Sequence, residues 1–192
     1  MLTDEKINLL ARVARTPYVT APAGPTDRSI LLLAAASYGS RPTDEATVPT
    51  GFDPYAAQLF ESIVEGAYLV ATADGVFDEE ERRTFERIVT AATGGTVAQR
   101  HVADLVADLA DQLAEDGLEL RVTRLAEGVT KREHAKEVLR IAALIAQVSD
   151  DVSPVERQLL EKLCAAFKLE PTELDAALAD VKAALAGNLP AS

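Results

Sequence analysis

This sequence of 192 residues has one cysteine and no tryptophan, and it lacks long apolar runs. The single cysteine, Cys164, excludes an internal disulfide and a cysteine-based metal cluster. The longest apolar run, 30–36, is far shorter than the roughly 20 residues that span a bilayer, so we expect no membrane insertion. Aromatic residues make up only 5% of the chain, and long β-branched or aromatic-rich runs are missing, which argues against a sheet.

Basic residues are also scarce, since 19 Lys and Arg stand against 31 Asp and Glu and leave a net charge of −12. Residues 1–53 contain six acidic and five basic residues, so nearly all of this excess lies in residues 54–192. An acidic surface repels nucleic acid and anionic membranes, and it favours cations and basic protein patches. The alternative is that the charge serves solubility alone. The start, MLTDEKINLL, is acidic and amphipathic, unlike a secretory signal, and we expect a cytoplasmic protein.

The chain is rich in Ala, Leu, Glu, Arg and Lys, which are good helix formers. From Pro54 onward, apolar residues recur at helical spacing between Gly and Pro breaks. We therefore predict an all-α fold, a compact bundle of about seven to nine helices. The expected helices cover residues 2–15, 27–38, 54–72, 78–92, 97–115, 118–128, 131–148, 153–168 and 171–186.

Proline and glycine cluster between residues 17 and 25 and again between 42 and 54. This composition predicts an N-terminal helical arm and linker over 1–53, followed by the main helical domain over 54–192. The arm carries an apolar stripe that includes Ile7, Leu10 and Val13. We expect the stripe to dock on the chain's own domain rather than on a partner.

An internal repeat emerges when the chain is shifted by 75 residues. Apolar residues of 63–71 then fall on those of 138–146, which by itself is weak evidence because any two amphipathic helices overlay. The loop and cap matches are more specific: Asp78 falls on Ser153, and Glu81 falls on Glu156. The sequence therefore predicts two helix–acidic loop–helix units, 54–92 and 129–168, related by pseudo-symmetry.

The first acidic loop, ATADGVFDEEER, places five carboxylates between Asp74 and Glu81. Capping alone accounts for part of this pattern, because Asp78 is a good N-cap with Glu81 at the capping-box position. The alternative is a site for a hard divalent cation, Ca²⁺ or Mg²⁺, which oxygen ligands favour. The candidate ligands are Asp74, Asp78, Glu80 and Glu81, with a weaker second loop at Asp150, Asp151 and Glu156.

The segment ADGVFDEEE and its weaker echo SDDVSPVER resemble the tellurite-resistance TerB family. The same helical domain is similar to the N-terminal part of the membrane-linked co-chaperone DjlA. The resemblance covers about residues 54–186 and implies a bundle of about seven helices, a cytoplasmic stress-response role and acidic patches that bind metal. It implies no catalytic activity. The second unit departs from the pattern, because Ser149 stands where the motif has Asp and Asp150 where it has Gly.

Other sites fit the sequence less well. The loop also resembles the second half of a calcium EF-hand, but Val70 and Thr72 stand where that loop needs acids. His101 and four acidic residues (Asp104, Asp108, Asp111 and Glu115) share one helical face, which is typical of a solvated surface and could otherwise be a ligand stripe. The Glu-x-x-His pairs of di-iron enzymes and the common nucleophile and phosphate-loop motifs are absent.

We therefore expect a non-catalytic, TerB-like interaction module of stress response that binds a protein partner and a divalent cation. The first alternative is a structural adaptor that docks a basic protein patch through its acidic face, without metal. The second alternative is a metallo-hydrolase with an unrecognised site. Direct binding of tellurite is disfavoured, because tellurite is an anion and the surface is strongly negative.

Overall fold

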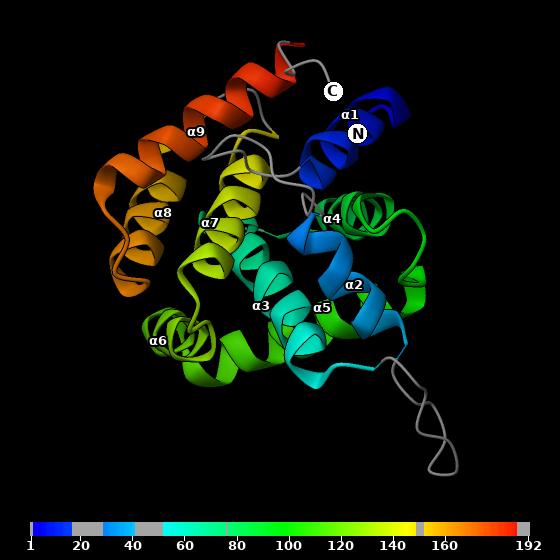
Figure 1. The fold of residues 1–192 in the computed structure, drawn as a ribbon, viewed down its shortest axis with the longest axis horizontal. Coiled ribbons are helices and arrows are strands. Elements are labelled where there is room, and N and C mark those ends of the chain that lie inside the picture. The colour runs from blue at the N-terminus through cyan, green and yellow to red at the C-terminus, as the bar shows by residue number, and fades with distance from the viewer. Residues whose placement is uncertain (1, 17–28, 41–51, 76, 149–151, 188–192) are drawn as a thin grey trace.

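The computed structural model describes residues 2–16, 29–40, 52–75, 77–148 and 152–187, and every regular element in these ranges is a helix, as predicted (Figure 1). None of these helices is both long and apolar enough to cross a membrane. The nine helices are α1 (Asp4–Arg15), α2 (Ile30–Gly39), α3 (Pro54–Ala71), α4 (Glu79–Ala92), α5 (Gln99–Asp116), α6 (Leu118–Gly128), α7 (Arg132–Ala146), α8 (Pro154–Ala166) and α9 (Pro171–Leu185).

The helices begin where local capping chemistry places them. In α1, α2, α3, α4 and α8, the N-cap side chain accepts a hydrogen bond from a backbone N–H of the first turn. The second helix, expected from residue 27 with Asp27 as its cap, has Ser29 as its N-cap instead: α2 begins after Ser29, whose hydroxyl accepts from Leu32 N. Asp27 itself lies outside the described residues. The helix expected from residue 97 begins later, because Ala98 is extended and Val97 is buried before the helix.

The core is organised around α3 and α7, which pack together more extensively than any other pair of helices, closely followed by α2 with α3 (Figure 1). α2 covers α3, whereas α8 and α9 pack against α7. Close approach of α3 and α7 depends on Gly66, because a Cβ there would lie 2.6 Å from Cγ1 of Val138. The largest fully buried side chains come mainly from these two helices, among them Phe60, Ile63, Leu69, Leu139 and Leu144.

The N-terminal helix α1 packs against α4 and α9, and its apolar stripe is buried in the same core. Arg140 of α7 fixes the end of this helix by donating to the carbonyl oxygens of Val13 (3.1 Å) and Ala14 (2.8 Å). Glu137, one turn earlier, holds the guanidinium at 2.9 Å. A buried cation therefore supplies hydrogen bonds to carbonyl groups at the C-terminal end of α1. The division into an arm over 1–53 and a domain over 54–192 stays a prediction.

Asp78 and Ser153, which the 75-residue shift aligns, both lie at helix N-termini and both begin complete capping boxes. The helices that precede them, α3 and α7, are neighbours at the centre of the bundle. Superposition of the two units stays a prediction.

Candidate functional site

The first acidic loop joins the end of α3 to the start of α4. Thr72 follows α3, and its hydroxyl donates to the carbonyl oxygens of Tyr68 and Leu69, each at 3.1 Å. The chain then turns through Gly75, whose φ of 81° lies in the left-handed region that glycine adopts without a Cβ clash. Asp74 is exposed at this turn, and it lies between the end of α3 and the exposed carboxylates of α4.

Aromatic packing fixes the loop to the helices on either side. The ring of Phe77 meets Tyr68 of α3 edge-on, with centroids 5.4 Å apart, and meets Phe85 of α4 at 6.2 Å. Burial raises the pKa of Tyr68, so its phenol stays protonated. The loop is therefore anchored by an apolar side chain just before its acidic residues.

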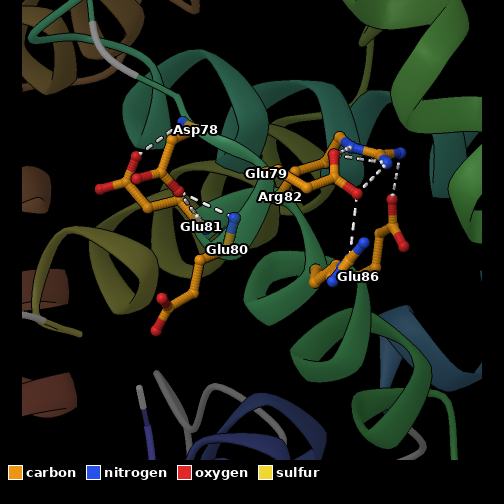
Figure 2. Close-up of polar contacts among 7 residues, drawn as sticks. Asp78, Glu79, Glu80, Glu81, Arg82 and Glu86 are labelled. Carbon is orange, nitrogen blue, oxygen red and sulfur yellow. Dashed lines mark hydrogen bonds and ion pairs between the residues drawn. The ribbon is translucent and has the colours of Figure 1, made fainter.

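The start of α4 is a reciprocal capping box (Figure 2). Oδ1 of Asp78 accepts from the backbone N–H groups of Glu80 (2.8 Å) and Glu81 (2.9 Å), and Oε2 of Glu81 accepts from Asp78 N at 3.0 Å. These bonds use one oxygen of each carboxylate, so the second oxygen of Asp78 and of Glu81 is not part of the box. The capping prediction for these two residues is confirmed.

Glu79 points to the other side of the helix from Asp78, Glu80 and Glu81 (Figure 2). Arg82 donates to both of its carboxylate oxygens at 2.8–3.0 Å, and Nε of Arg83 donates at 2.9 Å. The hydrogen bond from Arg82 lowers the pKa of Glu79. Arg82 also binds Glu86 at 2.9 Å, so this side of α4 is an ion-pair network.

The second acidic loop leads into α8 and uses the same cap. Ser153 Oγ accepts from Glu156 N at 3.2 Å, and Oε2 of Glu156 accepts from Ser153 N at 2.8 Å. Pro154 occupies the first turn, where its missing N–H has no cost. The other two candidate ligands of this loop, Asp150 and Asp151, lie outside the described residues.

The two capping boxes meet at one pocket of about 490 Å³. Its polar lining comes from Asp78, Glu80 and Glu81 of the first unit and Glu156 of the second, together with Thr84. Its apolar lining comes from α1, α3, α4, α7 and the segments beside them (Leu2, Ala71, Phe77, Phe85, Ile88, Ile145 and Val148). None of the described residues that line the pocket is basic.

This pocket is what the sequence did not predict. The sequence treats the two loops as separate candidates, whereas the fold brings Glu156 to the same pocket as three acids of the first loop. The signal that could have predicted it is the repeat itself, because each loop follows one of the two central helices.

The metal prediction is not tested by this arrangement. Carboxylate oxygens suit Ca²⁺ and Mg²⁺, and four of the predicted ligands lie at this end of the bundle. Within the described residues, no three or more His, Cys, Asp or Glu side chains are grouped closely enough to hold a metal ion. One oxygen of Asp78 and one of Glu81 accept capping hydrogen bonds from backbone N–H groups, and this is part of the reason why these carboxylates do not converge on one point.

Acidic residues elsewhere have other surroundings. Asp104, Asp108, Asp111 and Glu115 are exposed along α5, as expected for a solvated face, and His101 on the same helix is partly buried.

In the core, Glu65 accepts from Nε of Arg121 at 2.8 Å, and Arg121 also binds Asp116 at 3.1 Å. Burial raises the pKa of Glu65, although its hydrogen bond to Arg121 opposes the rise. This buried pair connects α3 to α6.

Fold and site together define an all-helical protein in which two capped, acidic helix starts meet at one pocket. Residues 61–179, more than half of the chain, match the family described as tellurite resistance protein TerB. The chain belongs to this family, and the predicted resemblance to it is confirmed. No curated protein and no solved structure matches the chain.

Proposed function

We propose that this protein is a non-catalytic, cytoplasmic binding module of the tellurite-resistance stress response, and that its ligands are positively charged. The proposal rests on the pocket between the two capped helix starts. Four carboxylates line this pocket, and none of its described lining residues is basic. Family membership supports the stress-response role. The strongly acidic sequence supports the sign of the ligand charge.

The first candidate ligand is a divalent cation, Ca²⁺ or Mg²⁺, bound at the first acidic loop. Arg82 and Arg83 neutralise Glu79, whereas Asp78, Glu80 and Glu81 lie on the side that lines the pocket. Like charges so close together repel, and a divalent cation relieves that repulsion. Binding requires the carboxylates of the first loop to come closer together, because among the described residues no three are grouped closely enough to hold an ion.

The second candidate is a basic protein patch, docked without metal. The apolar part of the pocket favours it, because a metal ion uses only oxygen ligands and leaves an apolar surface exposed. Both candidates are non-catalytic, and they differ in whether the ligand contacts carbon as well as oxygen.

Calorimetric titration with Ca²⁺, Mg²⁺, Mn²⁺ and Zn²⁺ tests the first candidate. We expect binding of Ca²⁺ or Mg²⁺ and weaker binding of Zn²⁺, which prefers Cys and His. Glu81→Gln is the sharpest variant, because Gln at this position keeps the capping box but removes the charge.

Glu156→Gln makes the same change in the second capping box and is the matched control. We expect Glu81→Gln to weaken cation binding more than Glu156→Gln does, because the first loop contributes most of the charge. Equal losses would contradict preferential binding at the first loop. No heat of binding with any of the four ions would remove the first candidate.

A further inference from the structure

The pocket between α4 and α8 combines an acidic surface with an apolar one. Asp78, Glu80, Glu81 and Glu156 give it an acidic rim, and Phe77 and Val148 are among the partly buried apolar side chains that line it. These carboxylates come from two segments about 75 residues apart in the sequence. The charge and the apolar surface are therefore brought together by the fold and not by one local motif.

The dimensions and the lining together select the kind of ligand. About 490 Å³ lies within the range of roughly 300–1,000 Å³ typical of pockets that enclose organic groups. A single ion would leave most of this volume unfilled, and a purely apolar group would remove charged carboxylates from water without supplying a positive charge, which is costly. A long basic side chain fits both surfaces, because its methylene stem covers apolar atoms while its charged end reaches carboxylates.

We propose that this pocket binds an amphipathic, basic helical segment of a partner protein, with one Lys or Arg side chain at the acidic rim and a neighbouring apolar side chain on Phe77 and Val148. The inference rests on the second candidate function and names its binding site and partner chemistry. Charge complementarity carries it, since none of the described lining residues is basic. Helix-in-groove recognition uses such apolar anchors, one or two turns apart, with charged neighbours.

A labelled peptide tests the proposal with the full chain. The probe is a short fluorescein-labelled helix of Lys, Leu and Ala with Lys and Leu on one face, followed by fluorescence anisotropy. A second peptide replaces Leu by Ser, and a third replaces Lys by Glu. We expect the Lys–Leu peptide to bind and the other two to bind at least about tenfold more weakly, because one lacks the apolar side chains and the other lacks the positive charge.

Thr84→Arg is the decisive variant, because it places a basic side chain in the pocket. Thr84 lines the pocket within α4, and Glu80 lies four residues before it, a spacing that favours an ion pair. Arginine is also a better helix former than threonine, so the variant should fold. We expect it to abolish binding of the Lys–Leu peptide.

Thr123→Arg is the matched control. Thr123 is an exposed residue within α6 with Glu119 four residues before it, and it does not line the pocket. The charge-removing pair Glu80→Gln and Glu156→Gln should weaken peptide binding about fivefold, as expected for two partly exposed ion pairs. Asp108→Asn with Asp111→Asn, exposed on α5, is its control and should leave binding unchanged.

The outcomes separate the inference from the function on which it rests. Two results together would show that the pocket is not the binding site: the Lys–Leu and Lys–Ser peptides bind equally, and Thr84→Arg weakens their binding no more than Thr123→Arg does. Basic patches would then dock on the acidic surface in general. If the Glu–Leu peptide binds as well as the Lys–Leu peptide, charge does not select the ligand and the inference is overturned. If no Lys peptide binds, the second candidate function fails together with the inference.

Discussion

Replacing the N-cap of α4 separates the structural role of the first acidic loop from its proposed binding role. Asp78→Ala removes the acceptor of two backbone hydrogen bonds, from Glu80 N at 2.8 Å and Glu81 N at 2.9 Å. Loss of a well-formed N-cap costs about 1 kcal/mol. For a chain of this length, that corresponds to a fall in melting temperature of roughly 2–4 °C.

The matching change at α8 should cost less. Ser153 accepts only one backbone hydrogen bond, from Glu156 N at 3.2 Å, so we expect about 0.5 kcal/mol for Ser153→Ala. Asp78→Ser keeps a cap acceptor and should recover most of the stability that Asp78→Ala loses.

The assay is thermal and urea unfolding of these variants in the presence of a chelator, so that bound metal does not contribute. The reasoning is refuted if Asp78→Ala unfolds like the wild type, or if Asp78→Ser is as unstable as Asp78→Ala. In either case the hydrogen bonds at the start of α4 would not be what stabilises it.

Three further changes test the packing and the buried charges. Gly66→Ala should lower the free energy of unfolding by about 1 kcal/mol in urea titrations, because a clash with Val138 outweighs the better helix propensity of alanine; a gain in stability would contradict it. Arg121→Met should cost about 3–5 kcal/mol near neutral pH by leaving Glu65 buried and charged. Because burial raises the pKa of Glu65, the loss should shrink as the pH falls and this carboxyl is protonated; an equal loss at pH 5 and pH 7 would refute this. Burial, with the nearby Lys131, lowers the pKa of His134 from its ordinary 6.5, so the unfolded chain binds the proton more readily and stability should fall as the pH drops below 6.5. His134→Gln should flatten that part of the stability profile, and an unchanged slope would count against it.

Helix identity and helix starts were predictable from the sequence because they depend on local chemistry. Asp78 with Glu81 and Ser153 with Glu156 form the capping boxes that their three-residue spacing predicts. Such contacts lie within one turn of helix and need no tertiary information. The start of α2 was missed because Asp27 and Ser29 are both residues that commonly cap helices, and the sequence does not rank them.

Contacts between distant segments were not predictable in the same way. Arg140 lies in the middle of α7, where sequence patterns place arginine at the surface, yet it is buried against the end of α1. The five acids of the first loop look alike in sequence, but Arg82 and Arg83 bind only Glu79 among them. The meeting of Glu156 with the first loop depends on how α3 and α7 pack, which one sequence does not specify.

The most direct test of the cation-binding claim is thermal unfolding of wild type and Asp74→Asn with and without Ca²⁺ or Mg²⁺, with Na⁺ at matched ionic strength as the control. A cation that binds only the folded loop stabilises it by about 2.7 kcal/mol at a hundredfold excess over its dissociation constant. We predict that the wild type melts at a higher temperature with the divalent cation. Asp74→Asn should lose most of that shift while its metal-free melting temperature barely changes. If the wild type melts at the same temperature with the divalent cation as with Na⁺, or if Asp74→Asn keeps the full shift, the first acidic loop is a well-capped helix start and not a cation site.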